Sequence, residues 1–280
     1  MARRPWRPRN RLFFLPAVSF FGLLYIYPLG CLIWWSLFSP SFGLDNYRTL
    51  ATPAYLQALL NTLEISSVVT LFSLLLSYPL AYALTMASPA VQMILLGAIL
   101  VPFWTSILVR SFAWVVILGN HGLINQGLLA LGLIDRPVQL IYNALGVQIA
   151  MVHVMLPFMV IPLYGVMARI DRSLVQAARS LGATRRQAFW NVFFPLSMPG
   201  VIAGSALVFL LATGFYITPA LLGGSGQITI PMMIDMAVNE LLNLGMGSAL
   251  GVLLLAVCGT IYVVLTTLPR AKLAGDVEAR

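Results

Sequence analysis

The sequence IDRSLVQAARSLGATRRQAFWNVFFPLSMP, residues 170–199, interrupts an otherwise strongly apolar chain. With the preceding Arg169, it carries five of the sixteen Lys and Arg residues. A basic loop between apolar segments is typical of the cytoplasmic side of a membrane protein. Its internal pattern also predicts two short helices separated by a turn.

The first of these helices is predicted from its ends. Asp171 is a suitable N-cap, and Gly182 stands where a left-handed residue closes a helix of roughly 10 residues. One apolar stripe follows at helical spacing: Ile170, Leu174, Ala178 and Leu181. Thr184 and Gln187 predict a capping box that opens the second helix. We expect Pro195 and Pro199 to disturb that helix before the next apolar segment.

Two readings of this loop are open from the pattern alone. The small pair Ala177 and Ala178 leaves room for another surface to approach a short exposed helix with a basic rim. A plain basic loop that only satisfies the positive-inside rule would show much of the same pattern.

Composition places the chain in the membrane. Of its 280 residues, 60% are hydrophobic and 9% are charged, whereas soluble domains carry about 25% charged residues. The sequence therefore predicts an all-α polytopic membrane protein. Its net charge of +8 does not indicate nucleic acid, because the basic residues flank apolar segments. Cys31 and Cys258 both lie in apolar runs and imply no disulfide framework.

A membrane-spanning helix needs about 20 apolar residues, and six segments meet that length. These spans are 12–38, 61–86, 93–119, 143–168, 200–222 and 247–268. They predict one transmembrane domain over 12–268, a basic N-terminus at 1–11, a loop at 169–199 and a tail at 269–280. The first apolar run is too long for a signal peptide, so we expect it to be an uncleaved span. The external segment 223–246 opens with a Gly-rich stretch, and its part IPMMIDMAVNELLNLG, residues 230–245, is expected to form an amphipathic helix along the outer surface.

Charge predicts the orientation. Thirteen of the sixteen basic residues fall in the N-terminus, the central loop and the C-terminal tail, so all three are expected in the cytoplasm. Most acidic residues are expected on the external side: Asp45, Asp135, Asp235 and Glu240 fall in external segments, and Glu64 lies near the outer end of the second span.

The chain lacks the motifs of an energy source or an enzyme. Lys272 is its only lysine, and no phosphate-binding G-x-x-x-x-G-K-[ST] motif occurs, so ATP-driven work would need a separate ATPase polypeptide. His121 and His153 belong to no cluster with metal-ligand spacing. We therefore expect no catalytic residue, metal or cofactor, and we interpret His153 mainly as a packed, hydrogen-bonded residue.

Ionisable residues inside the membrane indicate a substrate pathway. The candidate pathway residues are the ionisable Glu64 and Arg110, the aromatic Trp104 and Tyr216, and the external Asp235. Arg110 either faces the interior and pairs with Glu64 or Asp235, or extends to the outer interface between Trp104 and Trp114.

Resemblance adds to this reading of the loop. Part of the loop is similar to the EAA motif of ABC importer permeases in its residues and spacing. It reads Gln176-Ala177-Ala178, three residues, Gly182, nine residues and then 192–195. The family pattern is Glu-Ala-Ala, three residues, Gly, nine residues, Ile, one residue, Leu, Pro. This chain departs from it at Gln176, which cannot make the charged contact of a Glu, and in having Val and Phe at the two aliphatic positions.

The resemblance implies that the loop is a cytoplasmic coupling helix, which seats in a groove of the ATP-hydrolysing subunit at 170–186. The residues carried over to that role are Arg172, Leu174, Gln176, Ala177, Ala178, Gly182 and Pro195.

Other stretches resemble the spermidine/putrescine subgroup of these permeases over roughly residues 45–265. They are NYRTL, NTLEIS, SYPLAYAL, PFWTSILVRSFAW, HGLINQGLLALGLID, MVHVMLPFMVIPLYGVMARID and ITPALLGG. The resemblance implies the type I ABC importer permease fold, a bacterial inner-membrane location and alternating access. It also implies a second permease, two ATP-binding subunits that hold ATP and Mg, and a periplasmic binding protein.

Other functions stay open. The same class of importer also carries amino acids, opines and other amines. A stand-alone channel or secondary transporter would be expected to show several buried carboxylates or inverted repeats, and the sequence shows neither. A membrane enzyme would need a polar cluster that the sequence does not show.

Overall fold

The computed structural model describes residues 15–39 and 42–278, whose regular structure is entirely helical. The helices are α1 (Leu15–Phe21), α2 (Tyr27–Phe38), α3 (Asp45–Leu50), α4 (Pro53–Met86), α5 (Pro89–Leu100), α6 (Ile107–Leu118), α7 (Leu123–Ala130), α8 (Ala144–Met167), α9 (Arg172–Ser180), α10 (Arg185–Ala188), α11 (Phe194–Thr213), α12 (Ile217–Leu222), α13 (Ile230–Asp235) and α14 (Leu244–Glu278). Wider π-helical turns occupy Gly22–Ile26, Phe189–Phe193 and Met236–Glu240, and a tighter 3-10 turn occupies Val101–Trp104.

Six segments of the described chain are long and apolar enough to cross a membrane. They are Val18–Phe38, Pro53–Met86, Ile107–Ala130, Ala144–Met167, Arg185–Thr213 and Leu244–Val264. The predicted fold class, an all-α membrane protein with about six spans, is confirmed. The basic N-terminus expected at 1–11 lies outside the described residues, as does the end of the tail at 279–280.

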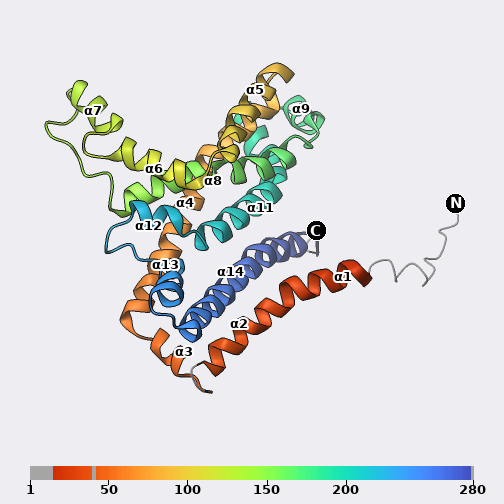
Figure 1. Ribbon diagram of the computed structural model, residues 1–280. Coiled ribbons are helices and arrows are strands. Elements are labelled where there is room, and N and C mark those ends of the chain that lie inside the picture. The colour runs from red at the N-terminus through yellow and green to blue at the C-terminus, as the bar shows by residue number, and fades with distance from the viewer. Residues whose placement is uncertain (1–14, 40–41, 279–280) are drawn as a thin grey trace.

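Three long helices, α4, α8 and α11, pack together as the core of the molecule (Figure 1). Met151, Met155 and Met159 of α8 are almost completely buried between them. α11 approaches α8 through glycine: a Cβ on Gly204 would lie 2.8 Å from Sδ of Met159, and a Cβ on Gly200 would lie 3.0 Å from Cβ of Val166. Small residues are what allow membrane helices to come this close.

Buried hydroxyl groups also link the helices. The Ser197 hydroxyl of α11 donates to the carbonyl oxygen of Phe194, at 2.8 Å, and therefore accepts from the Tyr78 hydroxyl of α4, also at 2.8 Å. Ser111 of α6 and Thr218 of α12 are hydrogen-bonded at 3.0 Å with both side chains buried. Hydrogen bonds between membrane helices contribute on average about 0.6 kcal/mol each.

Helices α2 and α14 pack side by side as a second layer, and α14 also contacts α11 of the core (Figure 1). We call α1, the π-helical turn Gly22–Ile26 and α2 together the flank. Burial separates the flank from the core: 56% of the apolar window in α8 is buried inside the chain, against 0% of the window within Val18–Phe38.

One expected span, 93–119, is two helices in the structure. α5 ends through the 3-10 turn Val101–Trp104, the backbone is extended at Thr105 and Ser106, and α6 then begins. Pro102 has no N–H to continue the helical hydrogen bonds of α5, which accounts for a break here. α6 turns into α7 at Gly122, where a Cβ would lie 2.3 Å from the carbonyl oxygen of Ile117, so only glycine fits.

The fifth span also differs from the expected 200–222. Helix runs without a break from Arg185 to Thr213, and the chain then opens at Gly214 before α12. Pro195 and Pro199, expected to disturb this helix, lie within it, and the π-helical turn Phe189–Phe193 immediately precedes α11, whose first turn contains Pro195. The widened π-helical turn immediately before Pro195 is a local distortion next to a proline that cannot donate a backbone hydrogen bond, and the helix continues through it.

Residues 230–245 are less regular than the single amphipathic surface helix we expected. They form α13 and the π-helical turn Met236–Glu240. Ile230, Pro231 and Ala237 are buried, and Ile230 and Ala237 belong to a second cluster that includes Leu50 and Leu250. The apolar side of this segment therefore packs on the protein itself.

Candidate functional site

The helix α9 is fixed at both ends by its own sequence. An Asp171 carboxylate oxygen accepts the N–H of Ser173 at 2.9 Å, and this hydrogen bond holds the pKa of Asp171 below its usual range. At the other end, Gly182 is left-handed with φ 93°, and the N–H of Ala183 donates to the carbonyl of Ala178 at 3.1 Å. Both predicted caps are confirmed.

The next helix, α10, begins with the predicted capping box. The N–H of Thr184 donates to Oε1 of Gln187 at 2.8 Å, and the N–H of Gln187 donates to Oγ1 of Thr184 at 3.3 Å. We call α9, the turn and α10 together the elbow, residues 172–188. Because each of its helices is capped and α10 continues into α11, the elbow is a well-defined extension of the core.

The predicted apolar stripe of α9 divides between two faces. Ile170 and Val175 pack against the core, and Ala178 is half-buried. Leu174 is 48% exposed and Leu181 is 90% exposed, with the exposed Ala177 on the same side of the helix. The elbow thus presents a small apolar outer face, a surface of the kind that contacts another protein.

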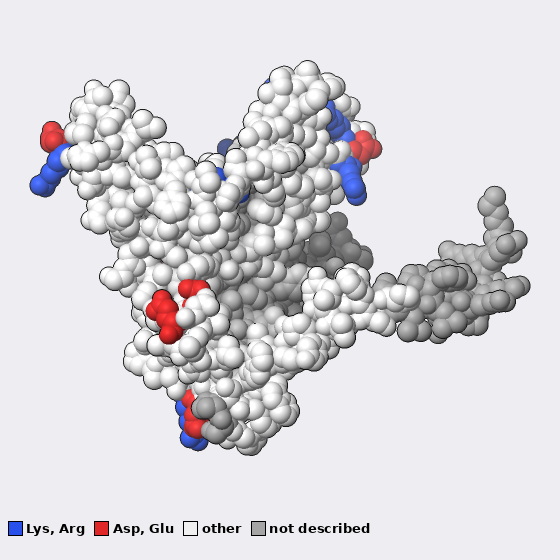
Figure 2. Space-filling view, viewed as in Figure 1, with Lys and Arg blue, Asp and Glu red and all other residues white. Residues whose placement is uncertain are grey.

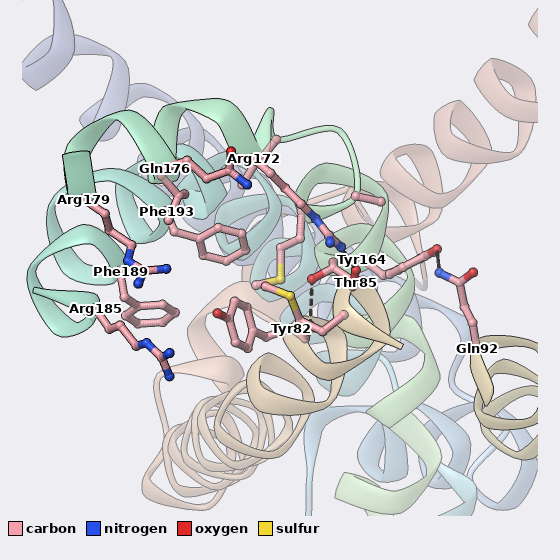
Figure 3. Close-up of a pocket in the computed structure, with 15 residues that line it drawn as sticks. Tyr82, Thr85, Gln92, Tyr164, Arg172, Gln176, Arg179, Arg185, Phe189 and Phe193 are labelled. Carbon is pink, nitrogen blue, oxygen red and sulfur yellow. Dashed lines mark hydrogen bonds between the residues drawn. The ribbon is translucent and has the colours of Figure 1, made fainter. Parts of the chain in front are cut away.

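A cavity of about 490 Å³ lies behind α9, between the elbow and the ends of α4 and α8 (Figure 3). An Arg172 guanidinium nitrogen donates to the carbonyl oxygen of Thr85, which joins α9 to the end of α4. The Gln92 amide of α5 donates to the Tyr164 hydroxyl of α8. The lining residues are Tyr82, Thr85, Met86, Gln92, Tyr164, Met167, Ala168, Ile170, Arg172, Val175, Gln176, Arg179, Arg185, Phe189 and Phe193.

The structure distributes the seven predicted coupling residues over the elbow and its continuation. Leu174, Ala177 and Gly182 are exposed, and Ala178 is half-buried. Arg172 and Gln176 line the cavity, although nothing in the motif spacing distinguishes their inward position. Pro195 lies in the first turn of α11.

At the opposite end of the core, the structure brings together two of the five candidate pathway residues. The Tyr216 hydroxyl donates to Oδ2 of Asp235 at 2.8 Å, and the Asn239 amide donates to Oδ1 of the same carboxylate at 2.6 Å. Figure 2 shows acidic side chains gathered over α13 and the turn that follows it, which contain Asp235 and Glu240. Asn239 was not predicted, although its i+4 spacing from Asp235 was a usable signal.

The other candidates do not join this cluster by any described contact. Arg110 makes no ion pair with Glu64 or Asp235; it donates instead to the carbonyl of Thr105, at 3.2 Å, across the break before α6. That carbonyl is left without a helical partner by the break, which explains why the guanidinium turns to it. Glu64 is exposed, and Trp104 is 81% exposed.

His153 is a packed residue in the structure. The indole N–H of Trp114 donates to Nδ1 of His153 at 3.3 Å, and their rings meet edge to face. Among the described residues, no group of three or more His, Cys, Asp or Glu is placed to hold a metal ion.

Comparison with known sequences identifies relatives over most of the chain. Residues 73–273 match the model of the family described as binding-protein-dependent transport system inner membrane component. The chain is 38% identical to the spermidine/putrescine transport system permease protein PotB of Escherichia coli K12 over 223 residues, which are 80% of this chain and 81% of that protein. It is 36% identical to PotB of Haemophilus influenzae over 75% of this chain and 73% of that one, and 32% identical to the inner membrane ABC transporter permease protein YdcU of E. coli K12 over 77% and 75%.

Solved structures share the fold. A chain of a bacterial alginate ABC transporter, in complex with an alginate pentasaccharide-bound periplasmic protein, matches with a TM-score of 0.76. The match covers 94% of this chain and 95% of that one, at 20% sequence identity. The helical arrangement is therefore that of ABC importer permeases.

Proposed function

The chain belongs to the family of binding-protein-dependent transport system inner membrane components, and within that family we propose that it is a permease subunit for a polyamine of the spermidine/putrescine kind. It is a non-catalytic transport permease of the ABC importer class, with homologues in the inner membrane. The observation that carries the polyamine assignment is the 38% identity to PotB over 80% of the chain. Import of another amine, an amino acid or an opine is the alternative within the same class.

We propose that the elbow is where a separate ATP-binding subunit docks. In its support, Leu174 and Leu181 present exposed apolar surface on a capped helix, and α10 continues directly into the core helix α11. On this proposal the elbow and both termini are cytoplasmic, as the positive-inside rule favours, and the ATP and Mg are held by two such partner subunits. A second permease completes the path, and the two permeases alternate between inward-open and outward-open arrangements.

The acidic end of the core is proposed as the entrance for the solute. Asp235 lies beside Tyr216, with Glu240 on the same segment. Carboxylates and aromatic faces are the groups that attract an organic polycation. A periplasmic binding protein would release the solute to this end, opposite the elbow.

Uptake measurements test the docking proposal. We expect Ala178→Trp and Gly182→Val to abolish ATP-dependent uptake of radiolabelled spermidine, because one adds bulk inside the elbow and the other forces a branched side chain into the left-handed region at φ 93°. Ala130→Trp, at an exposed position in α7, is the matched control and should transport normally. Membrane insertion should be unchanged in all three, and normal uptake by both elbow variants would reject the docking proposal.

A second measurement tests the solute. Asp235→Asn, Glu240→Gln and Glu64→Gln, made one at a time, are compared with Asp45→Asn, which removes an exposed carboxylate paired to Arg48 at 3.4 Å. We expect Asp235→Asn to raise the KM for spermidine most. If none of the three changes uptake, the acid-lined entrance is wrong. Accumulation of solute by the purified chain alone, without nucleotide, would instead indicate a secondary transporter.

A further inference from the structure

The cavity behind α9 is strongly basic and contains no acid. Arg172, Arg179 and Arg185 line it, and its lining includes neither Asp nor Glu. Within the described residues, the guanidinium groups of Arg179 and Arg185 make no hydrogen bond or ion pair. Figure 3 shows these two side chains on either side of Phe189, on the same wall of the cavity. Two arginines on one wall without a carboxylate are placed to bind an anion.

The cavity also lies at a particular depth in the molecule. The apolar helices α4 and α8 end at Met86 and Met167, and both of these residues line the cavity. Membrane-spanning helices leave the hydrocarbon at such ends, where the lipid headgroups lie. Tyr82 and Tyr164, also in the lining, are of the residue type enriched at that boundary.

The lining matches an amphipathic anion better than a small ion. Besides its arginines, the lining includes aromatic and apolar side chains, among them Tyr82, Ile170, Phe189 and Phe193. A free inorganic anion would use only the guanidinium groups and leave the rest of the 490 Å³ to water. A phospholipid brings a phosphate for the arginines and the upper parts of its acyl chains for the apolar part of the lining.

We propose that this cavity binds the phosphate of an anionic phospholipid, such as phosphatidylglycerol, from the leaflet on the α9 side. Arginine suits a phosphate because its planar guanidinium offers two parallel N–H donors. Basic pockets between the cytoplasmic ends of membrane helices are known to recognise lipid headgroups in this way.

Because the site lies between the elbow and the core, a bound lipid contacts both. Its arginines come from α9 and α10, whereas Met86 and Met167 come from the core. A bound phosphate therefore offsets part of the positive charge on the inner side of the elbow and joins the elbow to the core, while the outer face around Leu181 stays free. The inference goes beyond the proposed transport function and does not depend on which solute is carried.

Native mass spectrometry of the purified full-length chain in neutral detergent tests the proposal. Phosphatidylglycerol and phosphatidylcholine are titrated separately into the wild type, Arg179→Gln/Arg185→Gln and the matched pair Arg169→Gln/Arg186→Gln. The matched pair removes the same charge from the same segment, but neither of its residues lines the cavity. We expect one phosphatidylglycerol to bind in preference to phosphatidylcholine. The cavity pair, Arg179→Gln/Arg185→Gln, should weaken the affinity for phosphatidylglycerol about tenfold, and the matched pair should leave that affinity within about twofold of the wild type.

Other outcomes overturn the proposal. An equal loss in both pairs would show general attraction to a basic surface, and no loss in either would show that the cavity is not the site. Inorganic phosphate that binds alone at millimolar concentration, with the lipid showing no preference, would assign the arginines to free phosphate. If the cavity pair loses a copurifying ATP-binding subunit while its lipid titration is unchanged, Arg179 and Arg185 would be assigned to that partner.

A charge-conserving variant separates binding from folding. Arg179→Lys/Arg185→Lys keeps both positive charges and should retain lipid binding better than the glutamine pair, because only the bidentate geometry is lost. If the folded glutamine pair binds the lipid as tightly as the lysine pair and the wild type do, charge is not what the cavity recognises, and the lipid assignment fails.

Discussion

Helices α2 and α8 are both apolar, but they have different surroundings. The side chains of α8 are buried against α4 and α11, whereas Leu23, Ile26 and Trp34 of the flank are at least half exposed. The core helices contain small or hydroxyl residues at their contacts, such as Gly204 and Ser197. In the flank, a Cβ added at Gly30 would meet no atom within 4 Å.

This difference shows that apolar composition and packing are separate properties in a membrane protein. Lipid chains are as apolar as leucine side chains, so apolar residues place a helix in the bilayer without deciding what it touches. Close approach through glycine and paired hydroxyls decides which helices form the core. The open flank is left for lipid or for another subunit.

Filling a glycine contact in the core should have the largest effect. Gly204→Leu would place a side chain where even a Cβ lies 2.8 Å from Met159, so we expect a loss of about 3 kcal/mol or more in the free energy of unfolding. Gly30→Leu in the flank should leave stability nearly unchanged. Thermal unfolding of both variants in detergent compares them, and equal losses would contradict the division into core and flank.

Adjacent polar residues in α7 should show the next largest contrast. Asn125 is fully buried and bonds the carbonyls of Gly119 and Val138 and the N–H of Val138, at 2.9–3.1 Å. Asn125→Ala leaves those groups unpaired and should lower the free energy of unfolding by about 2 kcal/mol. Gln126→Ala, at the exposed neighbour, should change stability by less than about 0.5 kcal/mol. Similar values for the two would mean that burial of the amide is not what matters.

The hydroxyl pair between α4 and α11 should have a smaller effect. A double-mutant cycle of Tyr78→Phe and Ser197→Ala is expected to give a coupling of about 0.6 kcal/mol. Thr260 in α14 is the control, because its hydroxyl bonds only the carbonyl of Ala256 in its own helix, at 2.8 Å. No coupling in the cycle would show that the 2.8 Å contact does not stabilise the core.

Truncation in the flank should have the smallest effect on the chain by itself. Leu24 is 50% exposed, so Leu24→Ala is expected to change the free energy of unfolding by less than about 0.5 kcal/mol. The same variant should then be measured in the assembled transporter. A loss seen only in the assembly would show that another subunit covers the flank, whereas a loss in the isolated chain would mean that the flank belongs to the core.

The sequence predicted the parts of the fold that depend on local chemistry. The caps at Asp171 and Thr184 and the left-handed Gly182 form as expected, because each needs only residues within one helical turn. The number of apolar spans follows in the same way from composition. The break at Thr105 was not predicted, because Pro102 stands in a continuous apolar run like Pro157, which leaves α8 intact.

Contacts between distant segments account for the rest of the site. No local pattern shows that Ile170 packs on the core while Leu181 is 90% exposed, because both belong to the predicted apolar stripe. Tyr216 and Asp235 were each singled out, but their 2.8 Å hydrogen bond depends on how α13 packs after the turn. The cavity behind α9 requires the ends of α4 and α8, and Arg172 meets Thr85 there across a separation of 87 residues in the chain.

The uninterrupted helix from Arg185 to Thr213 has a mechanical consequence. At roughly 1.5 Å per residue, its 29 residues form a rod about 44 Å long, comparable to the full thickness of a bilayer with its headgroups. A tilt imposed at the Arg185 end therefore displaces the far end without waiting for any side chain to rearrange. Helical structure from Arg185 first ends at Gly214, so the angle between α11 and α12 is where such a tilt would be absorbed or passed on.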